Sequence, residues 1–193
     1  MDTEKRFGLK KSSAVMLFFQ MILTLILLVI SIYLLIFVCI NNLGGWMIAS
    51  YIFISLSVIS IIIYATIGYK KDDLFYGLSI LPFLGAIFVN ILLPQRNSLQ
   101  IALLVLLFGS TIAFLLKQKN KEVNSWISYA MVLIALIFSI YSAIKADTQF
   151  LGPIANSWFT YASMYISIFV PTIMCGTLAL TYKIRNDRLD SED

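Results

Sequence analysis

Long apolar segments without charge alternate with short charged segments along the chain. The first apolar run covers residues 12–69 and the last covers residues 148–182, and neither contains Asp, Glu, Lys, Arg or His. About 20 apolar residues are enough for a helix to cross the hydrocarbon core of a bilayer, where each span must satisfy its own backbone hydrogen bonds. The pattern therefore predicts an all-α integral membrane protein.

Six transmembrane helices are expected to form a single domain over residues 14–182. Residues 12–69 are too many for one span, and Asn41, Asn42, Gly44 and Gly45 supply turn formers that divide this run in two. Residues that commonly cap helix N-termini precede the later spans, at Asp72–Asp73, Asn97–Ser98, Asn124–Ser125 and Asn156–Ser157. The predicted spans are 14–40, 46–68, 74–93, 99–116, 125–144 and 157–182, with a basic segment at 1–13 and a charged tail at 183–193.

Basic residues predict how these helices are threaded through the membrane. Of the 14 Lys and Arg residues, all except Arg96 and Lys145 fall on one side if successive spans alternate in direction. Because cytoplasmic loops carry an excess of Lys and Arg, both termini are expected to be cytoplasmic, with three helical hairpins pointing outward. The run at 14–40 is longer than the apolar region of a secretory signal peptide, so we expect it to be retained as the first span. Abundant Ile, Asn and Lys suggest an AT-rich bacterial genome and hence a location in the plasma membrane.

Aromatic residues are expected to anchor the ends of the spans, since Trp and Tyr concentrate at membrane interfaces. In this topology the outer set is Trp46, Trp158 and Tyr161, and the inner set is Tyr69, Tyr76, Trp126, Tyr129 and Tyr182.

Composition supports the membrane assignment and limits the chemistry. Apolar residues make up 60% of the chain and charged residues 12%, against about 45–50% and about 25% in soluble proteins. Cys39 and Cys175 are predicted near opposite ends of the bundle, so we do not expect them to form a disulfide. The chain has no His and no CxxC motif, and no metal or other cofactor is expected.

No predicted span contains an ionisable side chain at its centre, which argues against catalysis and proton coupling. Charged residues inside membranes usually mark ion pathways, proton relays or voltage sensors. The adjacent pair Asp72–Asp73 is better explained as a cap at the positive end of a helix than as a metal site, because no third acidic residue lies nearby. We therefore expect no enzymatic activity. Basic inner segments are expected to contact anionic lipid headgroups, and nothing in them indicates nucleic acid.

Small and hydroxyl residues recur at helical spacing on three spans. These stripes are typical of helix packing faces in membranes, although the one on the second span could equally line a narrow wet path. The residues are Ser50, Ser57, Ser60 and Tyr64 on the second span, Ser128, Ala135, Ser139, Ser142 and Ala146 on the fifth, and Ser163, Ser167, Pro171, Cys175 and Ala179 on the sixth.

Five residues are candidates for helix kinks or a solute path. Pro82 and Pro171 fall within the third and sixth spans with Gly85 and Gly176 nearby, and interrupted helices are sites of substrate binding in transporters. Asn90 accompanies the first kink. Asn90 and Gln20 are the most polar residues inside the spans, and we expect them to form hydrogen bonds between helices rather than to bind a ligand.

Two functions remain open. The first is a non-enzymatic accessory, assembly or protective protein that contacts lipid, other membrane proteins or its own copies through its helix faces. The second is a transporter, or a transporter subunit, for a neutral or apolar solute that enters between the third and sixth spans. The six-span outline is shared by substrate-binding subunits of small vitamin transporters and by many other bacterial membrane proteins, and no motif selects among them.

Overall fold

A computed structural model describes residues 11–42, 44–66, 73–93, 96–117, 120–145 and 168–192. Within these residues the chain forms helices joined by turns, without strands. The helices are α2 (Lys11–Ile40), α3 (Gly45–Thr66), α4 (Asp73–Ile91), α5 (Ser98–Leu116), α6 (Lys121–Lys145) and α8 (Val170–Glu192).

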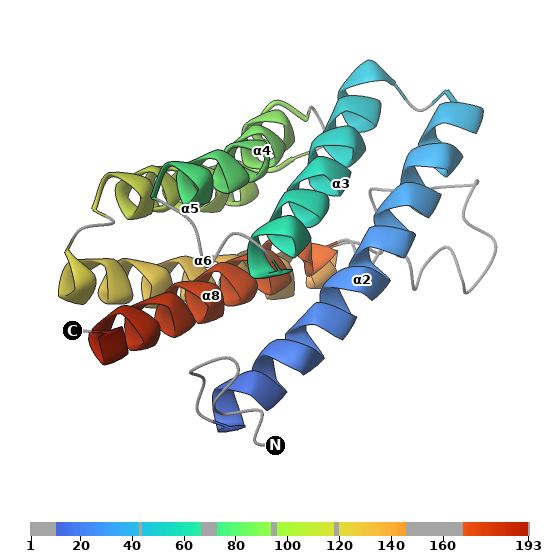
Figure 1. The fold of residues 1–193 in the computed structure, drawn as a ribbon. Helices are drawn as coiled ribbons and strands as arrows, with labels where there is room; N and C mark the ends of the chain where they lie inside the picture. Colours follow the sequence, from blue (N-terminus) through green and yellow to red (C-terminus); the bar gives the residue numbers. More distant parts are fainter. Residues whose placement is uncertain are drawn as a thin grey trace.

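The helices form one bundle in which each packs against the next along the chain, from α2 to α6 (Figure 1). The last helix, α8, lies beside α6 and also contacts α2 and α3, which joins the two ends of the series. A continuous core of buried apolar side chains runs between them and includes Leu27, Ile61, Phe83, Leu107 and Met174.

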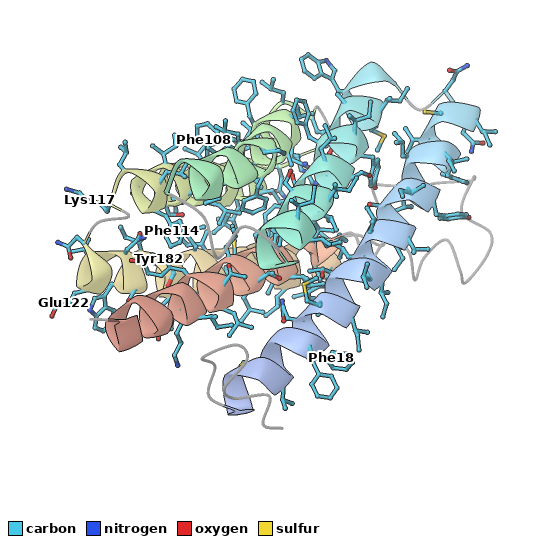
Figure 2. The ribbon with its side chains drawn as sticks, viewed as in Figure 1. Phe18, Phe108, Phe114, Lys117, Glu122 and Tyr182 are labelled. Atoms are coloured by element: carbon cyan, nitrogen blue, oxygen red, sulfur yellow. The ribbon has the colours of Figure 1, made fainter. Side chains whose placement is uncertain are left out.

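Among the described residues, four helices contain segments that are long and apolar enough to cross a membrane: Phe18–Ile40, Gly45–Ile63, Ser98–Leu116 and Glu122–Lys145. Many of their large apolar side chains face outward, as Phe18 on α2 does (Figure 2). In water, so much exposed apolar surface would be unfavourable, whereas a lipid environment solvates it. The predicted membrane class thus fits the structure. In the remaining two helices, Ile80–Ile91 of α4 forms a shorter apolar segment, and α8 is apolar before Lys183.

Several hydroxyl groups inside the bundle donate hydrogen bonds to backbone carbonyls of their own helices. Thr24 donates to the carbonyl of Met21 over 2.8 Å, and Thr111 donates to Leu107 over 2.7 Å. These local hydrogen bonds satisfy hydroxyl groups that are buried away from water and from charged partners. The predicted stripe on the fifth span is confirmed as an inward face, because Ser128, Ala135, Ser139 and Ser142 of α6 are buried.

Two predicted helix boundaries are confirmed by backbone geometry. The chain turns between α2 and α3 with Asn42 and Gly44 both at positive φ, the region that glycine and asparagine tolerate best. Before α5, the Asn97 side chain accepts from the Gln100 amide over 2.9 Å, and the Gln100 side chain accepts from the Asn97 amide. This reciprocal capping box satisfies two helix N-terminal donors.

Two other boundaries differ from the prediction. α6 begins a turn earlier than expected, since Asn120 caps it by accepting from the Val123 amide over 3.2 Å, while Asn124 is 0% exposed inside the helix. α8 continues to Glu192 through the predicted charged tail, because that segment has neither Gly nor Pro and charge alone does not end a helix. Asp72, the Asn156–Ser157 cap and the external loop after Lys145 lie outside the described residues.

Side-chain exposure tests several predictions about cysteines and aromatic residues. Cys39 is exposed, Cys175 is buried, and neither forms a disulfide, as expected. Trp126 is 76% exposed and suits an interfacial anchor. The assignment of Tyr182 to the inner aromatic belt is wrong: its side chain is 2% exposed, and its ring lies 5.2 Å from that of Phe114 in an edge-on contact (Figure 2). Its position along α8 is as predicted, but it faces the core.

Candidate functional site

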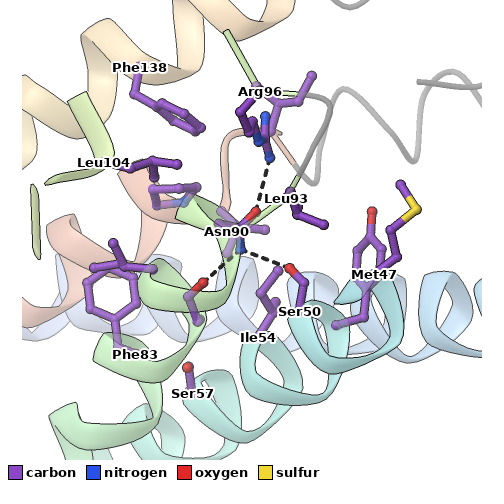
Figure 3. Close-up of a pocket in the computed structure, with 16 residues that line it drawn as sticks. Met47, Ser50, Ile54, Ser57, Phe83, Asn90, Leu93, Arg96, Leu104 and Phe138 are labelled. Atoms are coloured by element: carbon purple, nitrogen blue, oxygen red, sulfur yellow. Dashed lines mark hydrogen bonds between the residues drawn. The ribbon is translucent and has the colours of Figure 1, made fainter. Parts of the chain in front are cut away.

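A cavity of about 60 Å³ lies between α3, α4, α5, α6 and the start of α8. A buried water needs about 10–15 Å³ of such space, so the cavity has room for a few waters or for part of a small solute. Figure 3 shows the residues that surround it. The polar members are Ser50, Tyr51, Ser57, Asn90 and Arg96, and most of the others are apolar, among them Ile54, Phe83, Ile87, Leu104 and Phe138.

Asn90 connects the polar groups at one end of the cavity. Its amide nitrogen donates to Ser50 Oγ on α3 and to the Ala86 carbonyl on its own helix, each over 2.8 Å. Its oxygen accepts from Nη2 of Arg96 over 3.0 Å (Figure 3). The expectation that Asn90 bonds between helices is therefore confirmed. Gln20 also forms a hydrogen bond between helices: its side-chain amide on α2 donates to Thr177 Oγ1 on α8 over 2.8 Å.

Arg96 reaches this end of the cavity from the short segment between α4 and α5. Its backbone amide donates to the Leu93 carbonyl over 3.2 Å, which ties Arg96 to the residues just after α4. The guanidinium carbon lies 5.5 Å from the centre of the Phe138 ring, within the range of a cation–π contact. The residue as a whole is half-buried, but its Nε and Nη1 atoms are shielded from solvent.

Burial lowers the pKa of Arg96 to about 10, and the nearby Tyr51 opposes this shift electrostatically. Because this pKa stays well above 7, the guanidinium keeps its positive charge at neutral pH. The cavity therefore has a cationic end held by Asn90 and walls that are mainly apolar.

The backbone departs from regular helical geometry beside the cavity, just before α8. Ile168 is helical, Phe169 forms a turn, and α8 begins at the next residue, with Pro171 in its first turn. The Ile168 carbonyl accepts a hydrogen bond from Ser139 Oγ of α6 over 3.0 Å, and the Ser139 hydroxyl lies 2.8 Å from that of Thr172. Irregular backbone at membrane depth is tolerated where neighbouring helices satisfy it or where it lines a cavity.

Two of the five candidate residues line the cavity, and the other three lie elsewhere in the bundle. Asn90 and Pro171 line the cavity. Pro82 lies within α4, which continues through it as a helix, and Gly85 lies against Phe53 of α3, where a Cβ atom would come within 2.6 Å of the ring. A Cβ atom at Gly176 would lie 3.7 Å from Nε2 of Gln20, an ordinary contact distance. Their part in a solute path stays a prediction.

Arg96 is the functional candidate that sequence reasoning missed. It was counted as a charge in an outer loop, where a positive residue is normally solvated. Two features point to it in retrospect: it is the single charged residue between Asp73 and Lys117, and it follows Asn90 by only six positions. A short connection keeps such a charge near the polar end of the preceding helix.

In the part of the chain that the structure describes, no three His, Cys, Asp or Glu side chains come together as a metal site would require. No protein-family model, curated protein or solved structure matches the chain.

Proposed function

We propose that this chain is a six-span plasma-membrane protein that binds a small solute inside its helix bundle, as a transporter or as the solute-binding subunit of one. The observation that carries the proposal is the cavity beside Asn90 and Arg96, because it combines a fixed polar end with apolar walls. Small-molecule sites in proteins commonly have this composition, with a few placed polar groups in a largely apolar pocket.

The topology in this proposal is the one that the basic residues favour, with both termini in the cytoplasm. Asn90, Arg96 and the turn at Asn42 and Gly44 then lie toward the outer face. A solute would reach the cavity from outside, past Arg96, and would meet the interrupted start of α8 at its inner side. Such interruptions accompany substrate sites in several transporter folds.

A role confined to helix contacts is supported less well. Its main support is the set of small-residue packing faces, which any helix bundle in a membrane requires. It does not by itself account for a charged guanidinium that lines a cavity, where a charge costs free energy unless an opposite charge or hydrogen bonds offset its desolvation.

Two serines on α3 provide a matched test of water and solute access. Ser57 lines the cavity, whereas Ser55 is also buried but donates to Ser31 Oγ of α2 over 3.1 Å, away from the cavity. Each is changed to Cys in a background carrying Cys39→Ala and Cys175→Ala, and the protein in lipid nanodiscs is treated with methyl methanethiosulfonate. This neutral reagent reacts with thiolates, which form where a thiol meets water.

We expect Ser57→Cys to react at least about tenfold faster than Ser55→Cys, because Ser57 lines the cavity and Ser55 does not. Equal, slow reaction at the two positions would contradict a solute site between these helices and would favour the helix-contact role.

A further inference from the structure

We infer that the solute is a small amphiphile whose oxyanion end, a carboxylate or phosphate, binds at Arg96 beside Asn90, while its apolar part lies against Phe83, Ile87 and Leu104. The inference rests on the proposed function, because it assigns a ligand class to the same cavity. It departs from the neutral or apolar solute that the uncharged spans suggest, since Arg96 adds a positive charge that the span sequences do not contain.

The donor geometry favours an oxyanion over a neutral acceptor. A guanidinium presents several N–H donors in a planar fork that matches carboxylate and phosphate oxygens. Asn90 accepts from Nη2 of Arg96 and donates to Ser50 on α3 and to the Ala86 carbonyl on α4. These bonds orient the Arg96 side chain before a ligand binds. Ser50 Oγ accepts from Asn90, and because a hydroxyl can also donate, Ser50 could provide a further donor to a ligand oxygen.

The position of the charge strengthens this preference. Between apolar walls the local dielectric constant is low, and a positive charge attracts an anion more strongly there than in water. Arg96 is also stacked over Phe138, which limits its movement away from the cavity. Phe83, Ile87 and Leu104 line the same space and would remove an apolar tail from water.

The oxyanion could belong to either of two classes of molecule, a free organic acid or the headgroup of an acidic lipid. Both present an oxyanion attached to an apolar body. The test below uses hexanoate as the probe, with hexanamide as a neutral control of the same length and shape, and separates the two sources by changing the membrane.

Binding is measured by calorimetry on the full chain in nanodiscs of phosphatidylcholine, with empty discs subtracted. We expect hexanoate to bind at least about tenfold more tightly than hexanamide, since hydrogen bonds to a charged group are substantially stronger than neutral ones. Arg96→Gln should abolish this preference, and Arg96→Lys should restore part of it. Lys117→Gln, at an exposed position beyond α5, is the matched control and should leave it unchanged.

Adding phosphatidylglycerol to the discs separates the two sources. If phosphatidylglycerol competes with hexanoate, the site is assigned to an acidic headgroup; if the affinity for hexanoate is unchanged, the site is assigned to a free acid. Either result supports an oxyanion site.

Equal affinity for hexanoate and hexanamide in the unmodified protein would overturn the inference and leave the proposed function standing. If neither probe binds, the inference fails, and an unreactive Ser57→Cys thiol would show that the proposed function fails with it. The comparison of probes needs no variant, so it holds even if Arg96→Gln does not fold.

Discussion

Nη2 of Arg96 lies 3.0 Å from Oδ1 of Asn90 and donates a hydrogen bond to it, which attaches the segment between α4 and α5 to the end of α4. Asn90 is bonded in turn to Ser50 on α3. A charge, an amide and a hydroxyl from three segments of the chain therefore act as one polar unit at the end of the cavity.

Replacing Asn90 should disturb both this unit and the bundle. We expect Asn90→Leu to lower the free energy of unfolding by about 1–3 kcal/mol, because Ser50 and Nη2 of Arg96 lose a buried hydrogen-bond partner. Hexanoate affinity should also fall. Thermal melting in nanodiscs and calorimetry measure the two effects. Asn41→Leu is the control, since Asn41 is exposed and its side chain bonds to a carbonyl of its own helix. Equal losses in the two variants would argue against a special role for Asn90.

Gly85 should be required for the close approach of α3 and α4. A methyl group there would lie 2.6 Å from Cδ1 and 2.7 Å from Cε1 of Phe53, so the ring or the helix must move. We expect Gly85→Ala to destabilise the protein by about 1–3 kcal/mol, the usual cost of overpacking. Gly109→Ala on α5 meets no atom within 4 Å and should be neutral or slightly stabilising. Melting temperatures compare the two, and a Gly85→Ala protein as stable as Gly109→Ala would contradict the packing described.

The bond between Gln20 and Thr177 should contribute to holding α2 against α8. A double-mutant cycle with Gln20→Leu and Thr177→Val should give a coupling energy of about 0.6 kcal/mol and at most about 1.7 kcal/mol, the range found between membrane helices. Thr24→Val paired with Gln20→Leu is the control cycle, since the Thr24 hydroxyl donates within its own helix. Reversible unfolding in detergent provides the energies. A coupling no larger than that of the control cycle would mean that the bond does not join the helices in solution.

Oxyanion binding should be insensitive to pH over a wide range. Burial lowers the pKa of Arg96 to about 10, so the guanidinium is protonated below that value and loses its charge only as the pH rises through it. The chain has no His to titrate near neutrality, and hexanoate is ionised. The preference for hexanoate over hexanamide should therefore stay within about twofold between roughly pH 6 and 9, and fall at higher pH. Calorimetry at three pH values tests this; a large change between pH 6 and 9 would place the recognition on another group.

Local rules predicted helices and many boundaries well, because they depend on neighbouring residues. The turn at Asn42 and Gly44 and the cap at Asn97 follow from side-chain chemistry within a few positions. The same rule was ambiguous at α6, where Asn120 and Asn124 are both suitable caps and the packing of the bundle buries the second.

Contacts between residues far apart in the sequence could not be predicted from local sequence patterns. Tyr182 lies where an interfacial anchor is expected, but its direction depends on Phe114 on another helix. Arg96 looked like an ordinary loop charge because its neighbours in sequence do not reveal Phe138 or Tyr51. Asn90 was found because an amide in an apolar span needs a partner, although the sequence did not show which one.

Protection of the Ser57→Cys thiol by solute is the most direct test of the cavity as a binding site. The rate of reaction with methyl methanethiosulfonate is measured with and without hexanoate, in proteins with Arg96 and with Arg96→Gln. We expect hexanoate to slow the reaction severalfold when Arg96 is present and to have little effect in the Arg96→Gln protein. A reactive thiol whose rate is the same with and without hexanoate in the Arg96 protein would contradict the account.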